Sequence, residues 1–222
     1  MTNIILADIS NISNNWFEQM YDLVDLDRRE KTDKYIFDRD KHLSLMSEIC
    51  LYYLLAEKFH IKYSFIEKDY TMNGKPVISN ISNLYYSISH SGNKCIVGLS
   101  DISEIGIDME YICGFSNSQF KDTLMKIFSE DEMKKIQSNE NDIVKALILW
   151  TKKEAYFKSQ GVGTFRSMLH KSFSNSELKS ISTVIKEGYI ISYANFQEPL
   201  SFFDVREIGV DSMIDCIKKW KA

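Results

Sequence analysis

The chain has 222 residues, enough for one large domain or two small ones that share a substantial core. Hydrophobic residues make up 44% and charged residues 26% of the sequence, which excludes a disordered or fibrous protein. The formal net charge of -4 argues against a general nucleic-acid binder, because such proteins neutralise phosphates with excess Lys and Arg.

In chain order, the sequence predicts a strand at Ile4–Ile9, a helix at Asp40–Phe59, strands at Leu84–Ser89, Cys95–Leu99 and Ile105–Glu110, a helix at Asp142–Gln160, and strands at Ile181–Ile185, Tyr189–Tyr193 and Phe202–Glu207. The helices are predicted because apolar residues recur at three- and four-residue steps. Gly161 is placed to end the second helix. Before that helix, Ser129 and Glu132 have the capping-box spacing that begins a shorter one.

Each half of the chain therefore has a long helix and several strands. Because helices and strands come in blocks rather than in strict alternation, we expect an α+β fold. The layout also suggests two similar halves joined near residue 103, with an N-terminal subdomain over residues 1–103 and a C-terminal subdomain over residues 104–222.

Two carboxylates stand close together at the end of a predicted strand. Asp108 and Glu110 follow the apolar run Ile105–Ile107, so on a strand both project from one face. Like charges at this distance resist joint ionisation unless a cation lies between them, and hard oxygen ligands suit Mg²⁺. For an isolated pair of this kind, a solvated strand end is the commoner explanation.

The second predicted helix carries another charged pair. Glu154 and Lys158 are one helical turn apart on one stripe, which on many helices is only an exposed ion pair. If Glu154 lies beside Asp108 and Glu110, it completes a three-carboxylate Mg²⁺ site, and Lys158 is free to neutralise a phosphate oxygen.

Three further motifs have both a structural and a functional explanation. Gly74-Lys75-Pro76 is a turn, and Ser87–Gly92 is a strand end with hydroxyls and an imidazole that could hold a phosphate. The basic residues between Arg28 and Lys41 alternate with acids, a pattern typical of a solvated helix face.

Cysteine usage and the first residues bear on the compartment. Because the four cysteines are widely spaced without a Cys-x-x-Cys pair, we expect buried reduced thiols rather than a zinc site or disulfides; they are Cys50, Cys95, Cys113 and Cys216. The first twenty residues contain no Lys or Arg and no apolar run long enough for a signal peptide. We expect a cytoplasmic protein that neither enters a membrane nor binds nucleic acid.

Taken in order, these motifs resemble those of the Sfp-type 4'-phosphopantetheinyl transferases. The most specific matches are Ile105–Glu110 and Trp150–Lys158, separated by the family's usual interval. Upstream, Arg28–Lys31, Gly74–Pro76 and Ser87–Gly92 also match, so the resemblance extends from residue 28 to about residue 163.

The resemblance implies two similar α+β subdomains related by pseudo-twofold symmetry, with coenzyme A between them. It assigns the Mg²⁺ ligands to Asp108, Glu110 and Glu154, with Glu132 as a further acid at the edge, and the pyrophosphate lysine to Lys158. At the other end of coenzyme A it assigns the 3'-phosphate to Arg28, Lys31, Ser89 and His90, and the adenine to Gly74, Lys75 and Pro76.

The implied reaction transfers the 4'-phosphopantetheine arm of coenzyme A to a serine of an apo acyl- or peptidyl-carrier protein, with release of adenosine 3',5'-bisphosphate. Glu154 is the first candidate for the general base, although metal binding makes a carboxylate a poor base. The carrier could serve nonribosomal peptide or polyketide biosynthesis, and a monomer is sufficient. Tyr111–Phe128 is a candidate docking segment, with a subdomain linker that runs into a core helix as the alternative.

One departure concerns the 3'-phosphate. The family commonly has an Arg followed by Thr just after its His, whereas this chain reads His42-Leu43-Ser44. Ser44 can still donate a hydrogen bond, and Arg39 or Lys41 could compensate. We expect a weaker grip on this phosphate, which a Leu43→Arg variant would restore.

Two functions from other classes remain open at the level of the motifs. A metal-dependent phosphohydrolase that acts on a nucleotide would use the same acids, and a non-catalytic coenzyme A binding module would bind without turnover. Neither explains why Glu154 and Lys158 accompany Asp108 and Glu110.

Overall fold

The computed structural model describes residues 2–114, 127–136, 142–161, 172–173, 177, 180–197 and 203–221. Its first half contains β1 (Thr2–Asp8), α1 (Asn14–Leu23), α2 (Leu26–Asp33), α3 (Asp38–Phe59), the 3-10 turn η1 (Tyr63–Phe65), β2 (Lys68–Tyr70), β3 (Pro76–Ile78), β4 (Tyr85–Ser91) and β5 (Lys94–Ser100). Its second half contains β6 (Gly106–Tyr111), the 3-10 turn η2 (Ile112–Gly114), α5 (Glu130–Ile136), α6 (Asp142–Ser159), β7 (Ile181–Lys186), β8 (Tyr189–Ala194), β9 (Arg206–Glu207) and α8 (Val210–Lys221).

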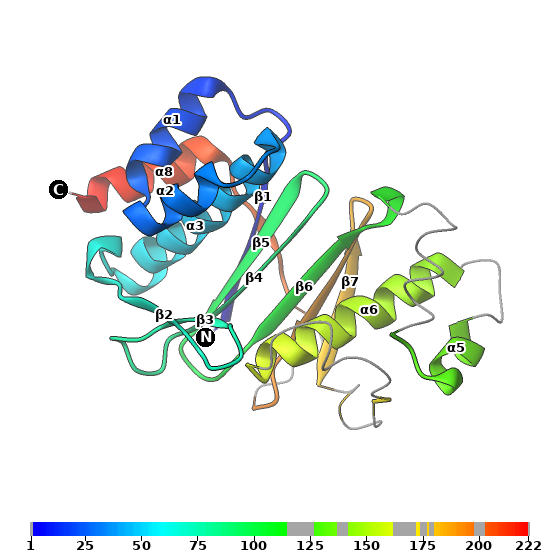
Figure 1. Ribbon diagram of the computed structural model, residues 1–222. Coiled ribbons are helices and arrows are strands. Elements are labelled where there is room, and N and C mark those ends of the chain that lie inside the picture. The colour runs from blue at the N-terminus through cyan, green and yellow to red at the C-terminus, as the bar shows by residue number, and fades with distance from the viewer. Residues whose placement is uncertain are drawn as a thin grey trace.

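The strands form two larger sheets and one hairpin. One sheet has the order β4-β5-β1-β9, in which only the β1–β9 pair is parallel. The other is the antiparallel sheet β6-β8-β7, and β2 pairs with β3 in the hairpin. Helices α1, α2, α3 and α8 cover the first sheet on one side, while α6 packs on β6 and β8 on the other side of the molecule (Figure 1). The fold is thus mixed α and β, as the sequence predicts.

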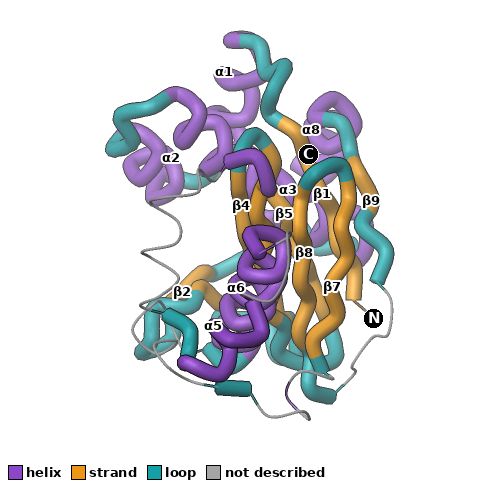
Figure 2. Tube along the Cα trace, turned by 90° about the vertical axis from the view of Figure 1, so that its right-hand side faces the viewer, coloured by secondary structure: helices purple, strands orange, loops and turns teal. Residues whose placement is uncertain are grey.

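Side-chain alternation explains why the first sheet is buried on both faces. In β1, Ile5 and Ala7 point into a core shared with the helices, whereas Ile4 and Leu6 point into a core shared with the second sheet. The strands of both sheets therefore lie next to one another across an apolar layer, with α6 beyond them (Figure 2).

The long helices match their predicted positions closely. Helix α3 extends only two residues further at its start than predicted, and α6 ends one residue early, before Gly161 with its left-handed φ of 64°. The capping box is confirmed: the Ser129 N–H donates to Glu132 Oε2 (2.9 Å) and the Glu132 N–H donates to Ser129 Oγ (3.3 Å).

Several elements differ from the sequence-based expectations. Helices α1 and α8 and the β2–β3 hairpin were not predicted, and α2 was indicated only as a solvated helix face of charged residues. Of the run Phe202–Glu207, only Arg206–Glu207 is a strand among the residues described, because its pairing with β1 covers two residues. All four thiols are free, but only Cys50 and Cys95 are buried as expected, while Cys113 is exposed.

The end of the chain returns to the first half. Met213, Ile214 and Ile217 of α8 belong to the same core as α3 and β5. The proposed division near residue 103 is therefore crossed by β9 and α8. None of the helices in the described part of the chain combines the length and the apolarity that a membrane span requires.

Candidate active site

Three serines of β4 join the two sheets next to the predicted acids. The backbone N–H groups of Ile107, Met109 and Tyr111 in β6 donate to the hydroxyls of Ser87 (2.9 Å), Ser89 (3.3 Å) and Ser91 (3.1 Å), respectively. Because these residues alternate, all three hydroxyls lie on the face of β4 that meets β6.

The same hydroxyls hold the acids. Ser89 Oγ donates to Asp108 Oδ1 (2.8 Å), and Ser91 Oγ donates to Glu110 Oε2 (2.7 Å). Each of these serines thus accepts from a backbone N–H and donates to a carboxylate, which fixes the acids relative to β4. Since Ser89 uses its only hydroxyl proton on Asp108, its expected contact with a phosphate requires this bond to break.

Asp108 is the most buried of the acids and is paired with Lys158. Lys158 Nζ donates to Asp108 Oδ1 (2.7 Å) and to the Ile107 carbonyl (3.1 Å). The other carboxylate oxygen, Oδ2, is buried and has no hydrogen-bond partner among the residues that the structure describes. An acceptor left in this state costs free energy unless a ligand satisfies it.

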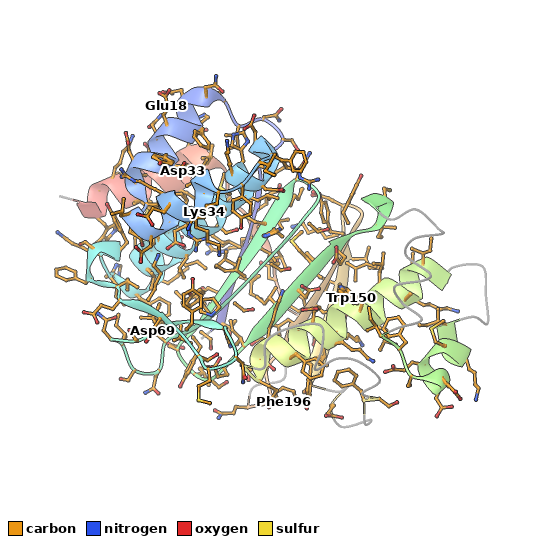
Figure 3. All side chains as sticks on the ribbon, viewed as in Figure 1. Glu18, Asp33, Lys34, Asp69, Trp150 and Phe196 are labelled. Atoms are coloured by element: carbon orange, nitrogen blue, oxygen red, sulfur yellow. The ribbon has the colours of Figure 1, made fainter. Side chains whose placement is uncertain are left out.

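Glu110 and Glu154 are both held in environments that oppose their charge. Burial, and next the negative charge of Asp108, raise the pKa of Glu110 to about 7, although Ser91 and Trp150 donate to it. Burial and Asp108 likewise raise the pKa of Glu154 to about 7, with Lys158 offsetting part of the effect. The charge of Asp108 therefore acts on both Glu110 and Glu154. Trp150 lies on α6 beside β6 (Figure 3).

A close approach of backbones places α6 against these acids. A Cβ atom at Gly106 would lie 1.8 Å from the Ala155 carbonyl oxygen and 2.5 Å from the Ser159 nitrogen. Only glycine allows β6 to come this near to α6, and this proximity lets Lys158 reach the Ile107 carbonyl.

The carboxylates of Asp108, Glu110 and Glu154 are suitable ligands for a divalent cation, but their oxygens do not surround a common point. Three carboxylates share one lysine, and a buried oxygen lacks a partner, which fits a hard cation such as Mg²⁺. Within the described ranges, however, no three Asp, Glu, His or Cys side chains lie close enough together to hold a metal ion. The Mg²⁺ site therefore stays a prediction.

Glu132 takes part in a different interaction from the one expected. Lys153, which is 0% exposed, donates to Glu132 Oε2 (2.7 Å) beneath the rings of Phe128 and Phe173. Because neighbouring helix residues point about 100° apart, Lys153 faces α5 rather than the side of Glu154. The Glu132 carboxylate is thus committed to the packing of α5 on α6.

Three of the residues expected at the 3'-phosphate lie together between α2 and α3. Arg28 Nη1 donates to Ser44 Oγ (3.4 Å), and Arg28 Nη2 pairs with Glu48 Oε2 (2.6 Å). Burial lowers the pKa of Lys31, and the nearby charge of Arg28 lowers it further. Neither Glu48 nor Lys68, which also binds Glu48, was singled out from the sequence, since only the fold brings them to this place.

The expectation about Leu43 needs correction. Leu43 is 3% exposed and belongs to the core beneath α3. An arginine there would point into the core, away from Arg28, so a Leu43→Arg variant cannot restore a phosphate contact. Ser44, next to Leu43 on α3, faces Arg28 instead.

His90 and the hairpin turn carry the remaining residues expected at the nucleotide end of coenzyme A. Partial burial of the ring lowers the pKa of the His90 imidazole, and the positive charge of Lys158 lowers it further. The negative charges of Asp40 and Asp108 offset part of this shift. Lys75 Nζ pairs with Glu104 and donates to the Ile105 carbonyl (3.1 Å). Lys75 and Pro76 line a cavity of about 230 Å³ that extends to β4.

Two family models match most of the chain. The sequence model of the 4'-phosphopantetheinyl transferase superfamily matches residues 104–202, and a model described as 4'-phosphopantetheinyl transferase, N-terminal, matches residues 11–101.

Individual relatives are distant and are matched over part of their length. The chain is 26% identical to the 4'-phosphopantetheinyl transferase ffp of Bacillus subtilis over 68% of this chain and 66% of that protein. It is 25% identical to the 4'-phosphopantetheinyl transferase Sfp of Bacillus subtilis strain 168 over 66% of this chain and 64% of that protein. For the human L-aminoadipate-semialdehyde dehydrogenase-phosphopantetheinyl transferase the identity is 25%, over 72% of this chain and 56% of that protein. The match thus spans less than two thirds of the length of each of these relatives.

Proposed function

Because the chain belongs to the 4'-phosphopantetheinyl transferase superfamily and is of the Sfp type, we propose that it moves the 4'-phosphopantetheine moiety of coenzyme A to a serine of an apo acyl- or peptidyl-carrier protein. The products are holo carrier protein and adenosine 3',5'-bisphosphate. The observation that carries the proposal is the crowded arrangement of Asp108, Glu110 and Glu154 around Lys158, with the unpartnered Asp108 Oδ2 among them.

Mg²⁺ would be held by Asp108, Glu110 and Glu154. Its charge would offset the repulsion between the three carboxylates and stabilise negative charge on the pyrophosphate oxygens of coenzyme A. Ser89 and Ser91 orient two of these acids through their hydroxyls, so the ligands are partly preorganised.

Lys158 and Glu154 are the chain's own groups for the transfer. The carrier serine oxygen forms a bond to the phosphorus that bears the pantetheine arm, and the bond from that phosphorus to the bridging oxygen breaks. Lys158 Nζ, now paired with Asp108, offsets the charge that develops on this oxygen. Glu154 is the first candidate to accept the serine proton, directly or through a water molecule, although bound Mg²⁺ would lower its pKa below the metal-free value of about 7.

The remaining groups would bind the nucleotide end of coenzyme A. Arg28, Lys31 and His90 would hold the 3'-phosphate, with Ser44 as a weaker contact. The turn at Gly74, Lys75 and Pro76 would lie against the adenine, next to the cavity that Lys75 and Pro76 line. We also propose that the enzyme works as a cytoplasmic monomer, since one chain supplies both ends of the site.

We propose that the carrier protein docks on the segment Tyr111–Phe128. Most of the candidate docking segment Tyr111–Phe128 lies outside the described residues, and its docking role stays a proposal. Carriers of nonribosomal peptide or polyketide assembly are the proposed partners.

Intact mass spectrometry of apo carrier proteins incubated with this protein, coenzyme A and Mg²⁺ tests the function directly. We expect a mass gain of one phosphopantetheine arm with the wild type, and none with Asp108→Asn or Glu154→Gln. Glu130→Gln, which removes the same charge as Glu154→Gln from an exposed position of α5, should transfer normally. Release of adenosine 3',5'-bisphosphate without any carrier, or coenzyme A binding without turnover, would support the hydrolase or the binding module instead.

A further inference from the structure

A buried carboxylate beside the predicted phosphate site is shared by two cations from different elements. Glu48 of α3 is 0% exposed. Arg28 of α2 lies 2.6 Å from its Oε2, and Lys68 of β2 lies 2.6 Å from its Oε1. Lys68 Nζ is also 2.5 Å from Asp25 Oδ2 and sits over the ring of Tyr52.

Asp25 ties Lys68 to the helix that carries Arg28 and Lys31. Its Oδ1 accepts the Arg28 N–H (2.8 Å) as the N-cap of α2, while its Oδ2 accepts from Lys68. Burial alone would raise the pKa of Asp25, but the hydrogen bonds from Lys68 and from the Arg28 N–H outweigh it and lower the pKa. The ammonium of Lys68 is therefore fixed relative to the start of α2.

The charges in this cluster do not balance. Among the described residues, Arg28 and Lys68 pair with Glu48 and Asp25, and the nearby Lys31, which is exposed, adds one positive charge that no ion pair balances. The pKa of Lys31 is lowered by burial first and by Arg28 next, and Lys68 adds to this effect, so the three cations repel one another. A buried ion pair is by itself weak evidence for a stabilising role. A group of cations with more positive than negative charge is, however, suited to bind an anion that neutralises the surplus.

Lys68 has the capacity to bind such an anion. An ammonium has three N–H donors, and two of them are directed to Glu48 and Asp25. The Lys68 side chain is 21% exposed and that of Arg28 is 16% exposed, so both reach the surface. Asp33 and Lys34 at the end of α2 and Asp69 on β2 lie on the same side of the molecule (Figure 3).

We propose that Lys68 is a specificity-determining residue that acts with Arg28 and Lys31 to bind the phosphate monoester on the ribose of coenzyme A. The inference rests on the proposed function, because it assigns a residue of the same substrate site. Lys68 comes from the hairpin that also carries the Gly74–Pro76 turn, so the hairpin would contact both the phosphate and the base.

Calorimetric titration with two nucleotides tests the assignment without turnover. Adenosine 3',5'-bisphosphate carries the ribose phosphate, and adenosine 5'-monophosphate lacks it. We expect the wild-type chain to bind the bisphosphate more tightly. Lys68→Met should weaken bisphosphate binding about tenfold, as expected for one charge-assisted hydrogen bond, and leave monophosphate binding unchanged.

Control variants separate this role from folding and from net charge. Lys219→Met removes a positive charge from an exposed position of α8 and should leave both affinities unchanged. Lys68→Arg keeps the charge and should retain most of the preference for the bisphosphate. If Lys68→Met does not fold, Lys68→Gln replaces it, because its amide can still donate to both carboxylates.

The possible results distinguish the inference from the function. Equal weakening of both nucleotides by Lys68→Met, or no weakening of either, overturns the inference, even if the wild type modifies carrier proteins. A bisphosphate preference that depends on Lys68, in a protein that modifies none of several carriers, overturns the transfer function and keeps the phosphate site. Coenzyme A and its 3'-dephospho form, compared as donors, should show the same dependence in KM, with kcat little changed.

Discussion

Replacing Glu154 by Gln tests whether the carboxylates of the acidic site are crowded as the structure indicates. The ordinary pKa of a glutamate here is 4.5, and burial together with Asp108 raises that of Glu154 to about 7. Each pKa unit is worth about 1.4 kcal/mol, so ionised Glu154 lowers the free energy of unfolding by about 2 to 3 kcal/mol after allowance for its partial exposure. The amide of Gln removes this cost.

The sign of the effect depends on pH. Below about pH 4.5 the carboxyl is protonated in both the folded and the unfolded state, and its raised pKa costs nothing. Between about pH 4.5 and about pH 7 the unfolded chain has released the proton while the folded protein retains it, so stability falls progressively, and above about pH 7 both states are ionised and no more is lost. The metal-free wild type should therefore lose stability relative to Glu154→Gln between pH 5 and pH 8.

Urea unfolding in the presence of a chelator measures this difference. The free energy of unfolding of Glu154→Gln minus that of the wild type should rise by about 2 to 3 kcal/mol between pH 5 and pH 8. The same difference for Glu130→Gln should stay constant, because Glu130 is exposed. Added Mg²⁺ should stabilise the wild type at pH 8 and leave Glu154→Gln nearly unchanged. A difference for Glu154→Gln that does not vary with pH would refute the crowding of these acids.

Two further variants test the packing on which the site depends. Gly106→Ala should lower the free energy of unfolding measured in urea by about 3 kcal/mol and reduce transfer, because its Cβ would lie 1.8 Å from the Ala155 carbonyl oxygen. The control Gly209→Ala should have little effect, because a Cβ there meets nothing within 4 Å. A stable and active Gly106→Ala variant would contradict this explanation. Leu43→Arg should lower the free energy of unfolding by about 3 kcal/mol or more, because it buries a charge. Ser44→Ala should lower it by about 1 kcal/mol and weaken binding of adenosine 3',5'-bisphosphate. Equal stability of the two variants would place Leu43 outside the core.

The sequence predicts those parts of the fold that have a strong local signal. The steps of apolar residues in α3 and α6 and the capping box at Ser129 and Glu132 are local, and each is present in the structure. Helix α8 was not predicted, although Met213, Ile214 and Ile217 have helical spacing, because a short segment at the end of a chain shows little local signal until it packs on α3.

Some residues of the candidate site have a local sequence signal, whereas others are brought together only by the fold. Asp108, Glu110, Glu154 and Lys158 were predicted from motif spacing, and the structure places Lys158 on Asp108. Ser91 could have been found, since Ser87, Ser89 and Ser91 alternate on one face of a predicted strand. Lys68 and Glu48 could not, because they are twenty residues apart and only the hairpin brings them together.

Strand β4 links the two ends of the proposed substrate site through its alternation. Ser89 and Ser91 face β6 and hold Asp108 and Glu110, whereas strand alternation places His90, between them, on the opposite face of β4. The two sheets are joined here by serine hydroxyls rather than by a backbone ladder. A one-residue shift of β4 would exchange the two faces, so the register of β4 with β5 fixes both the orientation of the acids and the position of His90. The spacing between the nucleotide end and the acidic end is thus determined by a single strand.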